Sequence, residues 1–298
     1  MTTDDPRMVA PMPVPRVLRA LRGAQWLVNA YALYRRNPGA WVLFLLALLA
    51  AMVLTSQLKV IGPLVFGLVF PVFSVGIALA AQAADRGEPV VPAHFFGGFR
   101  SSIGDLVAIG GIYLIGQLMI VGLMMAIGGA QVAQEMAAGM GPGGGPSPAP
   151  APGAPAVVSG AMALAGLVGL SLLVPLLLAT WFAPLLVFFH GQKALPSLLA
   201  SLGAALRNWR AFMMCFASLL LGMILVRLVV SVLVLVPGIG PILAMVFLGM
   251  VVSVIAPVGF IAFYTSYVDV FDPRDDAAPD ATPDATPDEE PDQKPEGG

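Results

Sequence analysis

Charged side chains are scarce in this sequence. Asp, Glu, Lys and Arg make up 11% of the 298 residues, whereas 58% are apolar and the mean hydropathy is +0.88. An ordinary soluble domain is roughly a quarter charged, and no water-soluble fold can bury the apolar surface that the present composition supplies. The scarcity of charge therefore excludes a soluble globular protein.

Cysteine and histidine are almost missing as well. Cys215 is the single cysteine, which excludes an intramolecular disulfide and a cysteine-based zinc site. His94 and His190 are the two histidines, and neither has a matched carboxylate pair nearby. They make a poor metal site or general base.

The sequence lacks the motifs of common enzyme classes. It has no nucleophile elbow, no phosphate-binding loop and no zinc-protease helix. A methionine cluster could hold only a soft metal such as Cu(I), and packing is the simpler interpretation; its members are Met119, Met124, Met125, Met136 and Met140. We therefore expect no enzyme activity, no metal and no cofactor.

Long uncharged runs are what the chain has in abundance. Each is at least about 20 residues long, the length that crosses roughly 30 Å of hydrocarbon as a helix. Only helices and closed barrels satisfy all backbone groups inside a bilayer. We expect an all-α polytopic bundle with six spans, at residues 40–58, 61–83, 106–128, 157–189, 211–236 and 241–266.

The fourth span is longer than one crossing requires. Pro175 and Pro184 lie inside it and can kink a helix. The run is consistent with one kinked helix or with a span followed by an interfacial helix. Ala161, Ala165 and Gly169 form a series of small residues in it, which would let another span or a second copy of the chain approach closely.

The membrane domain, residues 16–271, is flanked by segments that lack core-forming side chains. Residues 1–15 are rich in proline and are expected to form a disordered arm. Residues 272–298 carry ten acids and two cations in a Pro-Asp repeat, which predicts a disordered acidic tail. Residues 129–156 contain a Gly/Pro run and predict a flexible loop between the third and fourth spans.

Cations are concentrated on one side of the predicted topology. Six precede the first span, two lie in residues 84–104, three in 190–210 and two in the tail, against Lys59 alone in the loops of the opposite side. The positive-inside rule then places both termini in the cytoplasm and the loop 129–156 in the periplasm.

A basic and aromatic segment precedes each pair of spans. Residues 16–36 fit a helix with arginines spaced by three on one face, and residues 92–100 and 190–210 supply further short helix candidates. Such segments lie in the membrane interface with their cations at anionic headgroups. The arginines expected to contact lipid are Arg16, Arg19, Arg22, Arg35, Arg36, Arg207 and Arg210.

Two short strings recur. Arg36-Asn37-Pro38 before the first span resembles Arg207-Asn208-Trp209 before the fifth, and Ile61-Gly62-Pro63 recurs as Ile239-Gly240-Pro241 between spans. The pattern predicts three hairpins, each entered through a cytoplasmic interfacial helix. Chance matches are common in apolar sequence, so an internal duplication stays open.

Arg227 is the only charged side chain well inside a predicted span. An intramembrane cation costs roughly 2.5–3.5 kcal/mol on insertion scales, which makes it a candidate functional residue. The alternative is that it snorkels toward the periplasmic headgroups. No acid lies at matching depth, and this favours snorkelling.

Several strings resemble a family of multi-pass inner-membrane proteins of Gram-negative bacteria. They are RRNPGAW at 35–41, DRG at 85–87 with FGGFR at 96–100, FAPLLV at 182–187 leading to ALRN at 205–208, and YTSYVDVF at 264–271. The resemblance implies the topology and the location. That family has no assigned activity, so the resemblance implies no substrate.

The leading hypothesis is an inner-membrane protein that organises or regulates a membrane process without catalysis. Its expected partners are membrane lipids, with a membrane-protein partner or a homo-oligomer left open and no nucleic acid. The alternative is a small-solute or lipid transporter, suggested by the repeat, the proline-interrupted spans and Arg227. A polar cavity at mid-membrane beside Arg227 would favour transport.

Overall fold

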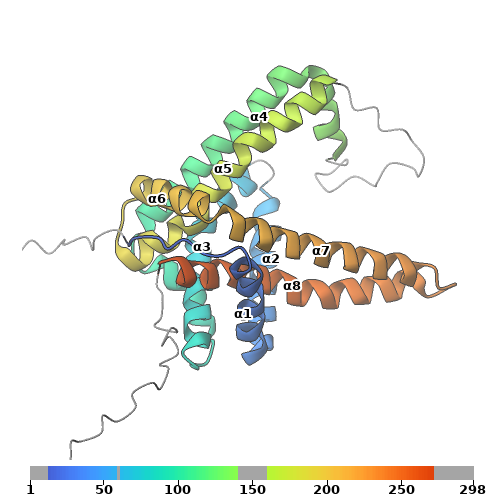
Figure 1. The fold of residues 1–298 in the computed structure, drawn as a ribbon. Helices are drawn as coiled ribbons and strands as arrows, with labels where there is room; N and C mark the ends of the chain where they lie inside the picture. Colours follow the sequence, from blue (N-terminus) through green and yellow to red (C-terminus); the bar gives the residue numbers. More distant parts are fainter. Residues whose placement is uncertain (1–12, 59–60, 140–159, 272–298) are drawn as a thin grey trace, which may run out of the picture.

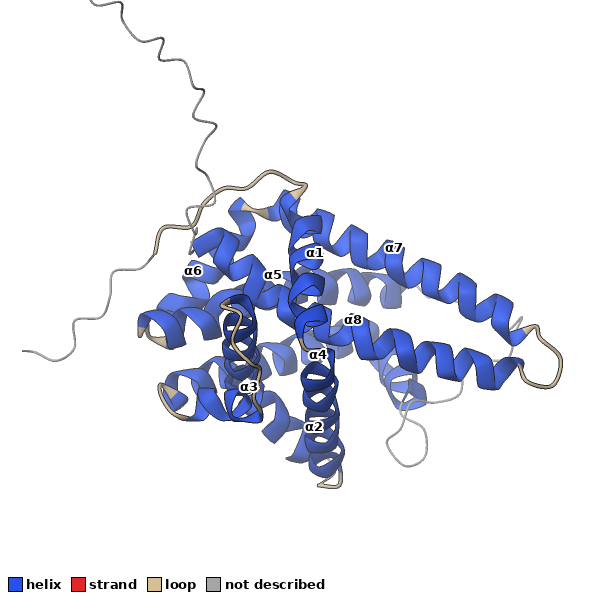
Figure 2. Ribbon diagram, turned by 90° about the horizontal axis from the view of Figure 1, so that it is seen from below, coloured by secondary structure: helices blue, strands red, loops and turns tan. Residues whose placement is uncertain are grey.

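All regular elements in the described part of the chain are helices. The computed structural model describes residues 13–58, 61–139 and 160–271. The helices follow in the order α1 (Arg22–Arg36), α2 (Pro38–Ser56), α3 (Ile61–Asp85), the 3-10 helix η1 (Pro92–Phe99), α4 (Ile103–Gly139), α5 (Gly160–His190), α6 (Ala194–Arg207), α7 (Trp209–Val234) and α8 (Gly240–Phe271) (Figure 1, Figure 2).

Six of these helices are long and apolar enough to cross a membrane. They are α2, α3, α4 as far as Gly129, α5, α7 and α8. The expected all-α polytopic bundle is thereby confirmed. Each pair of long helices follows one short helix, because α1 precedes α2 and α3, η1 precedes α4 and α5, and α6 precedes α7 and α8.

The three hairpins leave a shared base in different directions (Figure 1, Figure 2). The base consists of α1, η1, α6 and the adjoining ends of the long helices. The large buried side chains lie there, among them Trp26, Trp41, Phe182, Ile261 and Tyr264. Farther out, the hairpins form arms whose leucines, valines and methionines are exposed. An apolar arm of this kind is stable in hydrocarbon, where outward apolar side chains cost nothing.

Two hairpin turns are tightened by a glycine at the same place in the repeated string. A Cβ on Gly62 would lie 1.5 Å from the Thr55 carbonyl oxygen, and one on Gly240 would lie 2.5 Å from the Val234 carbonyl oxygen. No side chain fits at either position. The recurrence of Ile-Gly-Pro therefore has a shared structural cause, which is the close return of the second helix of each hairpin.

Two predicted boundaries are wrong. The interfacial helix begins at Arg22 rather than Arg16, because the preceding backbone is bonded to other elements of the base. The helix α4 runs past a break at Gly129 to Gly139, so residues 130–139 are helical rather than part of a loop. The remainder of the predicted loop, residues 140–156, lies outside the described residues.

The fourth span is one helix. It continues from Gly160 to His190 through both of its prolines. Ala165 and Gly169 of its small-residue series are buried, and a Cβ on Gly169 would lie 2.4 Å from the Met124 sulfur of α4. The small residues thus allow α4 and α5 of the same chain to pack closely.

Gly110 tests the close packing of α3 against α4. Gly110→Ala would place a methyl group 2.3 Å from the Leu68 carbonyl oxygen, and overpacking of this kind costs about 1–3 kcal/mol. We expect a clearly lower melting temperature for the purified protein in detergent. Gly104→Ala in the same helix meets nothing within 4 Å and should melt no lower than the unsubstituted protein. Equal melting temperatures for the two variants would contradict this packing.

Candidate functional site

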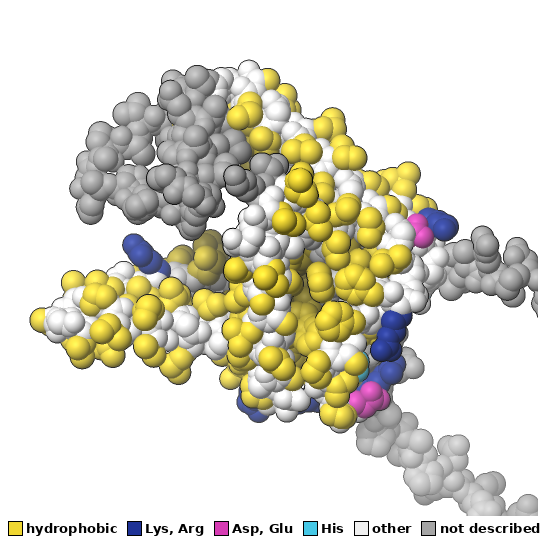
Figure 3. Space-filling view, turned by 180° about the vertical axis from the view of Figure 1, so that it is seen from behind, with side chains coloured by type: hydrophobic (Ala, Val, Ile, Leu, Met, Phe, Trp, Pro, Cys, Tyr) yellow, Lys and Arg dark blue, Asp and Glu magenta, His cyan; other side chains and the backbone are white. Residues whose placement is uncertain are grey.

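Charged side chains gather at the base (Figure 3). Among the side chains that the structure describes, every Asp, Glu, Lys and Arg except Arg227 lies in α1, in the segment before it, or at the base ends of the other helices and their connections. The base is therefore the candidate functional site. All seven arginines of the expected set are exposed, and two of them, Arg22 and Arg36, also make bonds that hold the fold together.

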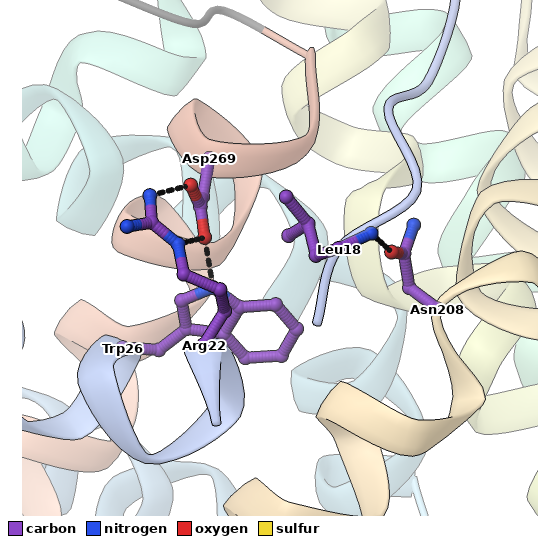
Figure 4. A network of polar contacts seen from close by, with 5 residues as sticks. All are labelled: Leu18, Arg22, Trp26, Asn208 and Asp269. Atoms are coloured by element: carbon purple, nitrogen blue, oxygen red, sulfur yellow. Dashed lines mark hydrogen bonds and ion pairs between the residues drawn. The ribbon is translucent and has the colours of Figure 1, made fainter. Parts of the chain in front are cut away.

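Arg22 bonds to α8. Its Nε donates a 3.0 Å hydrogen bond to Asp269 Oδ2, and its Nη2 pairs with Oδ1 of the same carboxylate. Trp26, one turn further along α1, donates its Nε1 proton to Asp269 Oδ2 at 2.8 Å (Figure 4). The Asp269 carboxylate, near the end of α8, thus accepts from two side chains on one face of α1. Arg22 thus joins α1 to α8, although its side chain is still 49% exposed.

Arg36 also has an internal role. Its Nη1 donates to the carbonyl oxygens of Ala84 and, at 3.1 Å, of Asp85. These are the last carbonyls of α3, which have no partner within the helix and carry the negative end of its dipole. The Asp85 carboxylate in turn accepts a 3.1 Å hydrogen bond from the Tyr264 hydroxyl. Arg36 therefore caps α3 at the point where α3 meets α8.

Asn208 fixes the segment that precedes α1. It is 1% exposed, and its Oδ1 accepts from the Leu18 N–H at 2.8 Å (Figure 4). Its Nδ2 donates to the carbonyl oxygens of Arg16 at 2.8 Å and Ala204 at 3.0 Å. The Arg16 N–H donates to the Val270 carbonyl oxygen at 2.9 Å. Among these groups, a helix starting at Arg16 would need only the Arg16 carbonyl, because the first four N–H groups of a helix have no partner within it. The bonds hold residues 16–18 against Asn208 and α8, and α1 starts later than the arginine spacing predicts.

The remaining arginines of the expected set are exposed, as Arg22 and Arg36 are, but their side chains bond to no other helix in the described structure: Arg16, Arg19, Arg35, Arg207 and Arg210. Arg35 lies over the ring of Tyr31 and Arg210 over the ring of Trp209, at 5.8 and 5.6 Å from guanidinium carbon to ring centroid. Large apolar side chains are exposed beside them, including Leu206 and Trp209. Cations next to aromatic and aliphatic side chains are typical of a surface at the level of lipid headgroups.

Two further polar residues of the base were missed by the sequence reasoning. The Ser201 hydroxyl of α6 accepts from the Phe182 N–H at 2.9 Å and donates to the Leu178 carbonyl at 2.8 Å, so it bridges a turn of α5 near Pro184. Asp105 of α4 accepts from the Ala194 N–H at 3.1 Å and pairs with Lys193 at 3.4 Å, which satisfies the start of α6. Asp105 could have been noticed in the sequence, because an acid beside an apolar run is unusual. Ser201 carries no such signal.

Arg227 stands apart from the base. It is exposed on α7, seven residues before the helix ends at Val234, which is about 10 Å along the helix axis at 1.5 Å per residue. Its outward position on the arm is the one that snorkelling requires. Intramembrane cations with a functional role usually face the interior of a bundle or a water-filled cavity.

The residues considered for metal binding are dispersed. His94 lies in η1, where its Nδ1 accepts from the Val91 N–H at 3.3 Å, and His190 ends α5, where its Nε2 lies 2.7 Å from the Tyr267 hydroxyl. Met124 packs on Gly169, whereas Met119 is exposed. The structure brings no group of three or more His, Cys, Asp or Glu side chains together within the described ranges.

A cavity of about 600 Å³ lies where the three hairpins diverge. Residues of α3, α4, α5, α7 and α8 line it, and most are aliphatic or aromatic, such as Phe66, Phe70, Trp181 and Phe263. Arg227 is not among the lining residues. This cavity is therefore not the polar cavity beside Arg227 that would favour transport of a polar solute.

Comparison with known proteins agrees with this architecture. The chain is 28% identical over 197 residues to a Burkholderia thailandensis protein named "Probable inner membrane protein", a match that covers 65% of this chain and 70% of that protein. No family model and no solved structure matches the chain. The likeness and the six apolar helices together identify a multi-pass inner-membrane protein and confirm the resemblance noted in the sequence.

Asn208 offers a test of the base. Asn208→Ala would remove the partners of the Leu18 N–H and the Arg16 carbonyl, and each unsatisfied buried group costs about 1–3 kcal/mol. Because slow proteolysis follows the population of the opened state, we expect trypsin to cleave after Arg16 and Arg19 about tenfold faster or more. Asn29→Ala, at an exposed position of α1, should cleave at the original rate. Equal rates in both variants would show that Asn208 does not hold this segment.

Proposed function

We propose that this inner-membrane protein is a non-enzymatic organiser whose base lies at the headgroups of the cytoplasmic leaflet and gathers anionic lipids around it. The observation that carries the proposal is the separation of the molecule into a polar, cationic base and apolar arms. A protein built in this way fixes its depth in the bilayer through its arms. It then presents one charged surface to one leaflet.

The exposed arginines supply the attraction. Arg22 and Arg36 are exposed but also bonded within the fold, so we assign the attraction chiefly to Arg16, Arg19, Arg35, Arg207 and Arg210. A basic residue near an anionic leaflet contributes about 1 kcal/mol. These residues come from the segment before α1, from α1 itself and from the junction of α6 with α7. They therefore act as one surface held by the fold rather than as a flexible basic tail.

The orientation follows from the same surface. The described chain starts and ends at the base, since Arg16 is bonded to Val270. Cations are retained on the cytoplasmic side of inner-membrane proteins. We infer that both termini are cytoplasmic and that the hairpin turns of α2–α3 and α7–α8 are periplasmic.

Organisation is favoured over catalysis and over transport of a polar solute. The polar side chains of Asp269, Asn208 and Ser201 in the base are used in holding helices together. The cavity is lined mainly by apolar side chains and lies away from Arg227. A membrane-protein partner or a second copy of the chain would meet the same exposed base, and the lipids gathered there would be shared with it.

Reporter fusions test the orientation. An alkaline phosphatase fused after residue 145 is expected to be active, because this enzyme folds in the periplasm, and a green fluorescent protein fused to the C-terminus is expected to fluoresce in the cytoplasm. The reciprocal pair of fusions is the control and should be silent. An active phosphatase at the C-terminus would overturn the orientation and the assignment of the base to the cytoplasmic leaflet.

Lipid co-extraction tests the gathering of anionic lipids. The protein is reconstituted in vesicles of phosphatidylcholine and phosphatidylglycerol and extracted with its surrounding lipids in a styrene–maleic acid polymer. We expect the extracted disc to be enriched in phosphatidylglycerol relative to the bulk vesicle. The enrichment should fall as salt is raised, because the screening length shrinks from about 10 Å at 0.1 M to about 3 Å at 1 M ionic strength.

The matched variants change charge at fixed positions. Substitution of Arg16, Arg19, Arg35, Arg207 and Arg210 by glutamine should return the lipid ratio to that of the bulk vesicle. Substitution of the same residues by lysine keeps the charge and should keep most of the enrichment. Arg227→Gln, outside the base, should leave it unchanged. A bulk lipid ratio in the unsubstituted protein, or full enrichment in the glutamine variant, would exclude the proposed function.

A further inference from the structure

We propose that the cavity between the hairpins is a binding site for the acyl chain of a membrane phospholipid. The site is separate from the basic surface and does not depend on the function proposed for it. All three hairpins contribute to its wall, through Phe66 and Phe70 of α3, Tyr113 of α4, Trp181 of α5, Phe216 of α7 and Phe263 of α8. At about 600 Å³, it falls in the range of roughly 300–1,000 Å³ that is usual for small-molecule sites.

The location of the cavity determines what can enter it. The lining residues lie within the six candidate spans, so the surrounding solvent is lipid hydrocarbon. Water needs several polar partners to occupy a cavity, and apolar walls without contents would lose their dispersion contacts. The molecules available to fill such a space are the acyl chains of the membrane lipids.

The polar groups of the wall support the same occupant. The Ser74 hydroxyl donates to the Pro71 carbonyl at 2.7 Å, the Thr180 hydroxyl to the Leu176 carbonyl at 3.2 Å, and Trp181 Nε1 to the Ser266 hydroxyl at 3.1 Å. These donors are satisfied within the protein. The Tyr113 hydroxyl makes no hydrogen bond to the residues described, and Pro71 and Pro184 leave the carbonyls of Gly67 and Thr180 without their usual helical N–H partner, so the wall offers a ligand few polar contacts. A hydrocarbon chain fits this wall, whereas a sugar, peptide or ion would lose its hydration without replacement.

The shape of the fold explains why the cavity is retained. Proline lies at the wall in both α3 and α5, as Pro71 and Pro184. On the side of the cavity toward the base, the helices pack closely. On the side away from the base, the hairpins diverge (Figure 1). Apolar side chains cover much of the face of the molecule seen in Figure 3. An acyl chain bound here would make the van der Waals contacts that the diverging hairpins do not make with one another.

Photo-crosslinking with a defined lipid tests the site. The purified full chain is delipidated in detergent and loaded with a phosphatidylethanolamine that carries a diazirine at the middle of one acyl chain. After irradiation, the adducts on the α3 wall, residues 66–74, are quantified by mass spectrometry. These positions are left unsubstituted in every variant, so the readout reports occupancy of the cavity.

Two variants fill the cavity from different hairpins. Val174→Trp with Leu177→Trp acts from α5, and Met213→Trp acts from α7; all three residues line the cavity and are 42–55% exposed, so the fold can accept the larger ring. The matched controls are Leu167→Trp with Leu170→Trp on α5 and Met223→Trp on α7, which are 58–67% exposed and do not line the cavity.

We expect the adducts on residues 66–74 to fall about tenfold or more in the filled variants, as exclusion of a few buried methylene groups predicts. They should stay unchanged in the controls. Adducts that persist equally in the filled variants would assign the label to lipid around the arms and overturn the proposal. A co-purified small molecule that stays in the delipidated protein and blocks labelling of residues 66–74 would overturn it as well.

Discussion

The docking of α1 onto α8 and α7 is the contact on which the rest of the base depends. One carboxylate, Asp269, accepts from both Arg22 and Trp26 of α1, and a Cβ on Gly23 would lie 1.8 Å from the Ala211 carbonyl oxygen of α7. The Thr265 hydroxyl adds a 2.9 Å hydrogen bond to the Trp26 carbonyl. A largely buried carboxylate is stable only when its oxygens are bonded, so the ion pair and the indole bond must form together. The first and last helices of the described chain are thereby joined, and the hairpins between them share one base.

The six long helices could be predicted from the sequence because a bilayer imposes a simple requirement. A run of some 20 apolar residues has to satisfy its own backbone in hydrocarbon, and this requirement is local. Gly-Pro strings marked the tight turns for the same reason, since a close return of the chain excludes a side chain. The element order of short helix, span and returning span followed from these local signals.

The polar interior of the base could not be predicted in this way. The spacing of Arg16, Arg19 and Arg22 indicates a helical face, yet the backbone at Arg16 and Leu18 is bonded to Val270 and Asn208, which are about 190 residues or more away in sequence. Bonds of such separation leave no periodic signal. Arginine also has two uses that composition cannot distinguish. Its planar group can bind a carboxylate or the end of a helix as readily as a phosphate, and only the neighbours of Arg22 and Arg36 show that they are engaged internally.

The two roles of the arginines and the position of the cavity both follow from how the hairpins are joined. Side chains that bond across the base, such as Arg36 to α3 and Ser201 to α5, hold the helix ends together at one level only. Beyond that level the arms have no comparable polar bonds between them in the described structure, and apolar side chains provide no preference for protein over lipid as a neighbour. Hairpins that are bonded to one another at the base, but have no preferred neighbour farther out, diverge. The same construction that concentrates cations at one membrane surface therefore opens an apolar space just inside it, and lipid contributes to both.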